Sequence, residues 1–434
     1  MRFLRIIISG IGIGGLLCLS AHAADDYDRA RALLDEAFSA HSAEDFVTVL
    51  AKAAEAAAIR PDHARFQSIL AAAHALNGDA DSAADVLHKL ASWGIHLGAA
   101  GSPAFDPVRD DPKIQNAFAA LKANQQPRGV RHLAFELPAN ARLWEGIAYR
   151  IATQETFHSD LYHATLHRRY ADGKITPFAT MPTAGFGCGG LAVDEPRALL
   201  WVSSPAMPEV HNFTPDLAGR SQLVAFNLTD GSVARIVELP QSADSSHTVV
   251  DLTLATDGTV FAADSTSPVI WSIEPGADTA EVWATIDAPG STHSLQGTAL
   301  SGDEAWLFVA DYSTGIHAIA TDTKKSILLS WEGPPTTTLL GIDGLSIRGN
   351  TLVASQNGVS PARVLAIELS LTAPSLITEV RTLAGGFPEL TDPTLLTPTE
   401  DGFLIIGNAG WPHFGSKPQP DSPARTVPIL YVTP

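Results

Sequence analysis

The most restrictive feature of this sequence is a strand-turn-strand pattern that recurs six times between residues 130 and 434. Each unit has a short segment rich in Val, Ile, Leu and Thr, a turn that contains glycine, and a second segment of the same kind. Such segments between glycine turns are typical of short β-strands. The units recur at intervals of roughly 45 to 60 residues, and they begin with EGIAYR, GGLAVD, VDLTLATDG, QGTALSGD, DGLSIRGN and DPTLLTPTEDG. This region must therefore fold as a repeated β-structure.

A six-bladed β-propeller is the fold that accommodates these units. Each unit has room for about four short strands, and a ring of such sheets leaves only short, protected strand edges. We therefore predict a mainly β protein in which residues 130–434 form a six-bladed propeller. The segments RHLAFELP, before the first unit, and TVPILYVTP, at the C-terminal end, also resemble strands. One of them could complete the last blade by pairing across the chain ends.

Residues 24–126 differ in composition and pattern: they are rich in Ala and Leu, and their apolar residues recur at helical spacing. The unit PDHARFQSILAAAHALNGDADSAADVLHKLASWGI resembles a tetratricopeptide helical hairpin. It has small residues where two helices must approach closely, at Ala71, Ala75 and Ala83 or Ala84. We predict a tetratricopeptide-like helical domain here, and the alternative is a plain helical bundle that caps the propeller.

The first 23 residues have the features of a secretory signal peptide. Arg2 and Arg5 precede an apolar run from Ile6 to Leu19, and AHA stands directly before Ala24. The apolar run is too short to span a bilayer. We therefore expect a periplasmic or secreted protein that is free of the membrane after cleavage.

The charge of the chain bears on its partners. The 47 acidic residues outnumber the 28 basic residues and give a net charge of −19. Such a surface repels nucleic-acid phosphates and anionic lipids. We expect neither nucleic acid nor a membrane surface as a partner.

The first residues of the six units are the strongest candidates for chemistry. In a propeller the first strand of each blade lines the central channel, so these residues should converge at one mouth of that channel. They are Glu145, Gly189, Val250, Gln296, Asp343 and Asp392, with Asp251 adjacent to Val250. Carboxylates that point inward repel one another unless protons or a cation neutralise them, and Ca²⁺ binds carboxylate and amide oxygens. The alternative is that these residues cap strands or hold channel waters.

Three motifs carry a resemblance to a known family. WEGIAY, GIDGLSI with ASQNGVSPARVLAIEL, and LTDPTLL with GNAGW resemble the gluconolactonase and senescence-marker-protein family of six-bladed propellers. The resemblance implies a divalent metal, usually Ca²⁺, bound by residues that match Glu145 and Asp343. Gln296 stands where the family has Asn and keeps the amide oxygen. Val250 departs from the family because its side chain cannot coordinate a metal, and Asp251 or Asp392 might supply the missing oxygen.

The same resemblance implies hydrolysis of lactones or related esters, with the metal polarising the carbonyl group. A base is also needed. His247 and His293 each lie three residues before a unit begins, so both should approach the same mouth, and histidine accepts a proton near neutral pH. The alternative for each is an ordinary surface histidine. Asp343 could itself act as base or nucleophile, as the resemblance permits.

A non-catalytic function is the second hypothesis. Val250 weakens the metal site, and repeat helices commonly present concave surfaces to other proteins. The propeller mouth would then bind a ligand, or the helices would bind an exported protein. Trp411 and His413, in GNAGWPHFG, could stack on an apolar ligand or only pack the loop of the last blade.

Overall fold

The structure is a computed structural model that describes residues 22–138, 142–241, 246–286, 293–414 and 426–434. Of the predicted signal segment, residues 1–21 lie outside this description. No helix among the described residues has the length and apolar character needed to cross a membrane.

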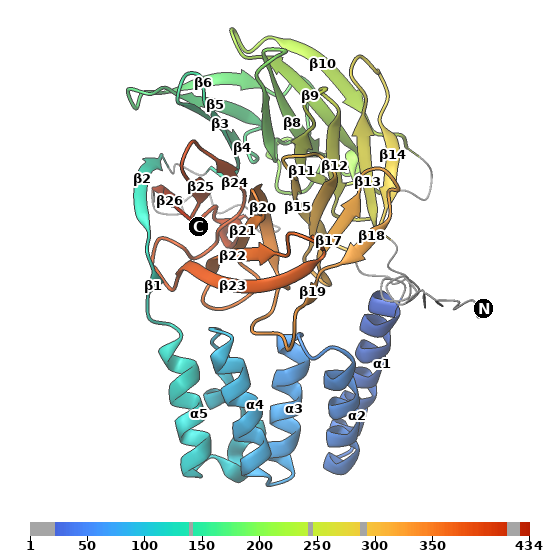
Figure 1. Ribbon diagram of the computed structural model, residues 1–434, viewed down its shortest axis with the longest axis vertical. Helices are drawn as coiled ribbons and strands as arrows, with labels where there is room; N and C mark the ends of the chain where they lie inside the picture. The colour runs from blue at the N-terminus through green and yellow to red at the C-terminus, as the bar shows by residue number, and fades with distance from the viewer. Residues whose placement is uncertain (1–21, 139–141, 242–245, 287–292, 415–425) are drawn as a thin grey trace, which may run out of the picture.

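From residue 22 onward, the part of the N-terminal region that the structure describes, five α-helices precede the first strand. Figure 1 shows them packed on one side of the propeller. Aspartate side chains accept hydrogen bonds from backbone N–H groups at the starts of three helices, a common way to satisfy those groups: Asp45 at α2, Asp79 at α4 and Asp111 at α5. Ala71, Ala75, Ala83 and Ala84 are buried in one cluster, which allows α3 and α4 to pack closely. Assignment of this pair to the tetratricopeptide class stays a prediction. The helices are α1 (His22–Ser42), α2 (Phe46–Ile59), α3 (Ala64–Leu76), α4 (Ala80–Ser92) and α5 (Pro112–Ala123).

The described strands form six sheets around a central channel, so the predicted fold class, a six-bladed propeller preceded by helices, is confirmed. The first three blades each contain four consecutive antiparallel strands. Blade 1 contains β3 (Trp144–Arg150), β4 (Glu155–Asp160), β5 (Thr165–Arg169) and β6 (Ile175–Thr180). Blade 2 contains β7 (Leu191–Asp194), β8 (Leu199–Pro205), β9 (Ser221–Asn227) and β10 (Val233–Glu238). Blade 3 contains β11 (Val249–Leu254), β12 (Val260–Asp264), β13 (Val269–Ile273) and β14 (Glu281–Thr285).

Blade 4 follows the same plan, and blades 5 and 6 vary it. Blade 4 contains β15 (Leu295–Leu300), β16 (Trp306–Asp311), β17 (Gly315–Ala320) and β18 (Ser326–Leu328). Blade 5 contains β20 (Ile342–Arg348), β21 (Thr351–Gln356), β22 (Arg363–Leu369) and β23 (Leu376–Gly385), and β23 also pairs with the short strands β1 (Arg128–Gly129) and β19 (Ser330–Trp331). Blade 6 contains β24 (Leu396–Pro398), β25 (Phe403–Ile406), β26 (Val427–Val432) and β2 (His132–Leu137).

Blade 6 closes the ring by pairing segments from the two ends of the propeller. Strand β2 pairs antiparallel with β26, in a register that places His132 opposite Tyr431 and Leu137 opposite Val427. The sequence predicted pairing across the chain ends, and both strand-like segments take part in it. This closure joins distant parts of the chain without a covalent link.

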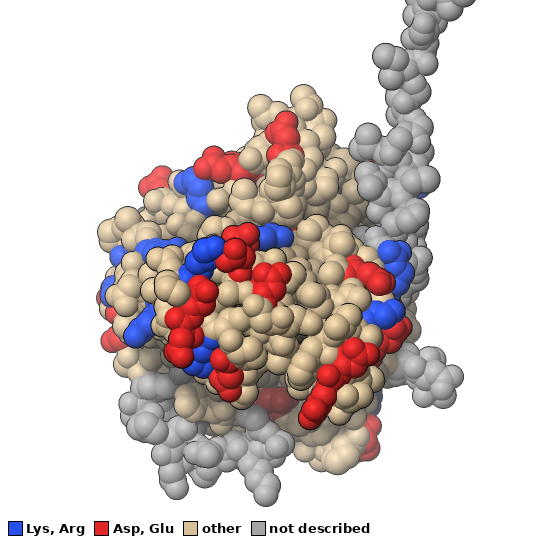
Figure 2. All heavy atoms as spheres, turned by 90° about the horizontal axis from the view of Figure 1, so that it is seen from below, with Lys and Arg blue, Asp and Glu red and all other residues tan. Residues whose placement is uncertain are grey.

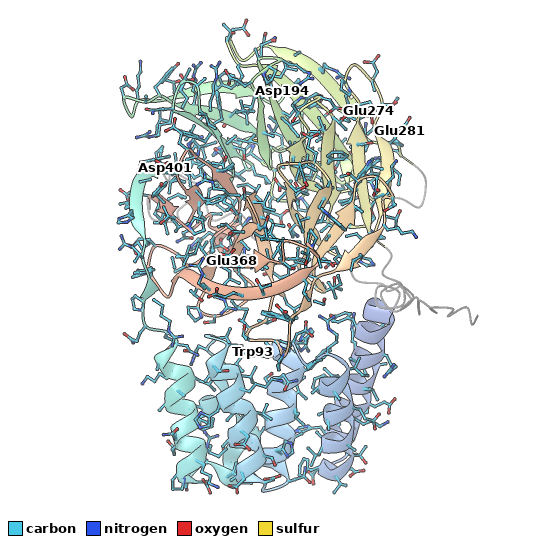
Figure 3. All side chains as sticks on the ribbon, viewed as in Figure 1. Trp93, Asp194, Glu274, Glu281, Glu368 and Asp401 are labelled. Carbon is cyan, nitrogen blue, oxygen red and sulfur yellow. The ribbon has the colours of Figure 1, made fainter. Side chains whose placement is uncertain are left out.

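The helices contact the propeller through the loops of blades 4 and 5. The carbonyl oxygen of Trp93 accepts hydrogen bonds from Arg363 and Thr337, and Figure 3 shows Trp93 where the helices meet these loops. Arg60 donates to the carbonyl of Thr314, and the backbone N–H of His96 donates to the carbonyl of Ser360. These loops lie at the end of the propeller where the first strand of each blade begins. The helices therefore pack beside the channel mouth that holds the candidate residues.

Candidate active site at one end of the channel

Four of the six predicted first residues occupy equivalent places at the start of the first strand of a blade, whereas Gly189 and Asp392 precede their strands β7 and β24. Glu145, Val250, Gln296 and Asp343 are each the second residue of their strand, in β3, β11, β15 and β20. Because the second strand of a blade runs antiparallel to the first, its end returns to this same mouth. The loops after β16 and β21 therefore surround these residues.

Glu145 and Asp343 are close enough to influence each other's ionisation. Burial, and then the charge of Asp343, raise the pKa of Glu145 well above its ordinary value. Burial raises the pKa of Asp343 to about 7, and a hydrogen bond from Asn357 partly opposes this effect. Charges on Asp251 and Asp392 raise both pKa values further. Near neutral pH this pair retains a proton unless a cation compensates its charge.

Asn357 orients Asp343. The Nδ2 atom of Asn357 donates to Oδ2 of Asp343 at 2.6 Å and to the carbonyl of Pro393 at 3.0 Å. The hydroxyl of Tyr312 donates to Oδ1 of Asn357 at 2.9 Å, which fixes the amide orientation. Burial, followed by the charges of Asp343 and Asp392, raises the pKa of Tyr312 to about 12, so this hydroxyl stays protonated. The motif ASQNGVSPARVLAIEL contains Asn357, but neither Asn357 nor Tyr312 was predicted as a site residue.

Trp411 contacts Glu145 directly, and Asp392 holds the backbone of Trp411 in place. The indole Nε1 of Trp411 donates to Oε2 of Glu145 at 2.7 Å. Oδ2 of Asp392 accepts hydrogen bonds from the backbone N–H groups of Gly410 and Trp411, both at 2.8 Å. Trp411 was predicted as a rim residue that might stack on a ligand, and the structure gives it a polar contact as well. Asp392 contributes charge to the site and fixes the loop that carries Trp411.

Asp251 lies one residue further along the channel than Glu145 and Asp343. At the corresponding position four other blades have glycine, because the first strands approach one another closely there: a Cβ on Gly146 would lie 2.2 Å from the carbonyl oxygen of Gly189. Oδ2 of Asp251 instead reaches blade 4 and accepts from the backbone N–H of Thr298 at 2.8 Å and from its hydroxyl at 3.2 Å. Burial raises the pKa of Asp251 to about 6, although these hydrogen bonds oppose the rise.

Gln296 and Val250 contribute differently from the carboxyl residues. The side chain of Gln296 donates from Nε2 to the hydroxyl of Ser294 at 2.9 Å, which leaves its amide oxygen as the group suited to a cation. The carbonyl of Val250 accepts from the backbone N–H of Gly190 at 2.8 Å and from the hydroxyl of Ser203 at 2.9 Å. Position 250 thus serves the packing between blades, and its side chain supplies no ligand.

His247 and His293 each lie against a buried aspartate at the end of a second strand. Nδ1 of His247 is 2.7 Å from Oδ2 of Asp264, and its ring meets that of Trp271 edge-on. Nδ1 of His293 is 3.2 Å from Oδ2 of Asp311. Both aspartates are fully buried. The structure therefore shows a positioning contact for each imidazole, and the catalytic role of the two histidines stays a prediction.

A buried aspartate that ends the second strand of a blade and contacts a basic side chain also occurs in blade 1. The sequence contains a pattern that indicates these aspartates. Asp160 ends β4, as Asp264 ends β12 and Asp311 ends β16, and it contacts Arg142 and His163. The signal is an aspartate at the end of the second segment in HSDLYH, AADSTS and VADYST. Recognition of that pattern would have indicated that His247 and His293 have partners in their own blades.

The fit to a divalent cation rests on the donor chemistry of two residues. The described residues include no group of three or more His, Cys, Asp or Glu side chains placed to hold a metal ion. Glu145 and Asp343 nevertheless fit a hard cation, because both are carboxyls, and their pKa values are raised first by burial and further by neighbouring carboxyl charges that a cation would offset. Their hydrogen bonds from Trp411 and Asn357 fall on one oxygen of each carboxyl.

Comparison with known proteins adds similarity of fold. No protein-family model and no curated protein sequence matches the chain. A gluconolactonase from Xanthomonas campestris is 17% identical, with a TM-score of 0.45 over 70% of this chain and 99% of its own. A calcium-binding protein, regucalcin, from Agrobacterium tumefaciens is 13% identical, with a TM-score of 0.46 over 70% and 95%. The PQQ-bound aldose sugar dehydrogenase from Streptomyces coelicolor is 15% identical, with a TM-score of 0.45 over 70% and 98%.

Proposed function

We propose that this protein is an exported hydrolase of a lactone or a related ester, with its active centre at Glu145 and Asp343. The observation that carries this proposal is the coupling of two carboxyls at the channel mouth, both with raised pKa values. Perturbed titratable groups in a concave site are typical of catalytic centres. Export rests on the signal-like features of residues 1–23.

The two carboxyls suit different tasks because each is held by a different donor, Asp343 by Asn357 and Glu145 by Trp411. Asp343, with a pKa of about 7, can accept a proton from the water that attacks the carbonyl carbon. Asn357 holds one of its oxygens, which directs the other toward this proton. Asp343 can then return this proton to the oxygen that leaves, while Glu145 would help to hold the cation. When bound, a divalent cation such as Ca²⁺ would polarise the carbonyl group.

The side chains that would hold such a cation are Glu145 and Asp343. Gln296, Asp251 and Asp392 are the further oxygen donors that the sequence suggested. Of these, Asp392 and Asp251 each use one carboxylate oxygen in hydrogen bonds to backbone N–H groups. We therefore place the first pair above the other three as candidate ligands.

Turnover of lactones and esters, with and without chelation, tests the proposal. We expect activity on some members of a panel of γ-lactones, δ-lactones and aryl esters, loss after chelation, and recovery with Ca²⁺ or another divalent ion. Glu145→Gln and Asp343→Asn should each lower kcat/KM by at least about 100-fold, as loss of a cation ligand or of a general base does. Glu281→Gln changes a carboxylate on the outer strand β14 and is the control (Figure 3). The proposal is wrong if Asp343→Asn retains full activity and elemental analysis finds no bound metal.

A second candidate function is ligand or protein binding without catalysis. The observation that favours it is that the described residues contain no group of three side chains suited to a metal. A protein partner would bind the helices, where the apolar side chains of Phe38 and Val47 are exposed. The face of the molecule seen from below carries both acidic and basic side chains (Figure 2). If the lactone panel gives no turnover, capture of exported proteins by the full chain, compared with the Phe38→Ser, Val47→Ser variant, tests this alternative.

A further inference from the structure

The helices contact a loop that helps to orient Asp343. Arg60 lies directly after α2 and is 5% exposed, and its Nη2 atom donates to the carbonyl of Thr314 at 3.1 Å. Thr314 belongs to the loop between β16 and β17, which also carries Tyr312. The hydroxyl of Tyr312 fixes the amide of Asn357, and that amide donates to the Asp343 carboxylate. Arg60 is therefore connected to Asp343 through one loop and two side chains.

The loop between β21 and β22 contacts the helices with an apolar side chain. Val359 is half-buried and packs against the buried apolar cluster formed by α3, α4, α5 and the segments between them. The carbonyl of Ser360 accepts a hydrogen bond from the backbone N–H of His96. Asn357, which donates to Asp343 at 2.6 Å, lies two residues before Val359. The helices thus hold the loop from which Asn357 reaches Asp343.

Two glycines leave these loops no room to shift separately. The N–H of Gly358 donates to the carbonyl of Gly341 at 3.0 Å, and the N–H of Gly341 donates to the carbonyl of Tyr312 at 2.9 Å. A Cβ added to Gly358 would lie 2.4 Å from the Cα of Gly341 and 2.8 Å from the hydroxyl oxygen of Tyr312. Gly341 stands two residues before Asp343. Contacts as close as these pass a displacement of one loop to the others, because packed protein interiors have low compressibility.

We propose that Val359 and Arg60 are positioning residues for the hydrolysis, through which the helices fix the orientation of the Asp343 carboxylate. This inference rests on the proposed function. Helices that only added stability could pack anywhere on the propeller, whereas the contacts of these two residues fall on the loops that carry Asn357 and Tyr312. A displacement of about 1 Å in a catalytic group can lower a rate about 100-fold, so loss of these contacts should be measurable at the base.

Steady-state kinetics on the most reactive lactone of the panel test the proposal. Val359→Ala should lower kcat by at least about tenfold and change KM by less than about twofold, because the base loses its orientation while substrate binding is kept. Val359→Ile keeps an apolar contact with the helices and should retain kcat within about threefold. Arg60→Met, which removes the donor to the Thr314 carbonyl, should show the same pattern as Val359→Ala. Val282→Ala, at a valine that is 54% exposed on the outer strand β14, is the matched control and should leave both constants unchanged.

Hydrogen exchange of residues 356–360 in the full chain, followed by mass spectrometry, measures the loop independently of activity. Val359→Ala should raise the exchange rate of this segment at least about tenfold, through opening of the Gly358 hydrogen bond, while the unfolding midpoint changes little. Val282→Ala should leave the rate unchanged. Faster exchange with an unchanged kcat would overturn the proposal, because the loop would then move without effect on the base, and so would an unchanged exchange rate. If the wild type turns over no lactone, the hydrolysis is refuted, and the exchange rates alone decide whether Val359 fixes the loop that holds Asp343.

Discussion

The two ends of the channel are built by the same six strands but differ in what they bury. At the end where the strands begin, Glu145 and Asp343 raise each other's tendency to hold a proton, and the helices pack beside them. At the other end, aliphatic side chains such as Leu345 are buried beside a cavity. The difference shows that one propeller strand can carry reactive groups in its first residues and packing residues after them. The carboxylate end is expected to cost stability, whereas the apolar end supplies it.

The largest expected effect concerns the contact between the helices and the carboxylate end. Arg363, which is 2% exposed, donates to the Trp93 carbonyl at 2.6 Å, to Oε1 of Gln356 at 2.6 Å and to the Thr337 hydroxyl at 2.8 Å. Arg363→Met removes these three hydrogen bonds of a buried charged group, although Thr337 still donates to the Trp93 carbonyl, and should lower the free energy of unfolding by about 4 kcal/mol. Guanidinium chloride unfolding measures the loss.

Arg381→Met is the matched control for this change. Arg381 is 44% exposed and pairs with Glu368 on the outer strands of blade 5, so its loss should cost less than about 0.5 kcal/mol. Equal effects of the two substitutions would show that the helices contribute little to holding the loops at this end.

Truncation of one aliphatic side chain at the apolar end should lower the free energy of unfolding by nearly as much. Leu345 is 3% exposed and lies two residues after Asp343 on β20. Leu345→Ala should lower the free energy of unfolding by about 3 kcal/mol through lost burial and the cavity that remains. Leu371→Ala, at a leucine that is 85% exposed, should change it by less than about 0.5 kcal/mol. A small effect at Leu345 would contradict the view that this end stabilises the fold.

The sequence predicted the carboxylate end of the channel but not the cavity at the other end. The repeat spacing was sufficient to bring Glu145 and Asp343 to one mouth, because each unit contributes one equivalent strand. Spacing does not encode the contacts between blades, so it did not reveal that Asp251 reaches Thr298 or that Trp411 donates to Glu145. Nor did it predict the cavity, which depends on how six separate strand ends diverge.

The carboxylate end should make stability depend on pH when no cation is present. The pKa of Asp343 is about 7 in the folded protein against an ordinary 3.8, so between these values the folded state binds a proton that the unfolded state has lost. The free energy of unfolding should therefore fall as pH rises through this window, by up to about 1.4 kcal/mol per pH unit. Glu145, whose pKa is raised well above its ordinary 4.5, adds a fall of the same sign as pH rises above that value.

Urea unfolding in the presence of a chelator, from pH 5 to pH 8, measures this slope. Asp343→Asn should flatten it, because the amide does not titrate. Addition of Ca²⁺ should raise the stability most at the upper end of the range if the carboxylates hold the ion as proposed. A wild-type profile without slope would show that the two carboxyls do not share an uncompensated charge.

The smallest change in the free energy of unfolding is expected for substitution of Asp251, which lies where the two ends of the channel meet. Near pH 8 its carboxylate is ionised, since its pKa is about 6, and Asp251→Asn removes a buried charge while it keeps an acceptor for the Thr298 N–H. These changes oppose each other, so the free energy of unfolding should shift by less than about 1 kcal/mol. Asp251→Ala lacks the acceptor and should cost about 1 to 2 kcal/mol more than Asp251→Asn. If Asp251→Asn instead stabilises the protein as strongly as Asp343→Asn, Asp251 belongs electrostatically to the carboxylate end, and the boundary between the ends lies further along the channel.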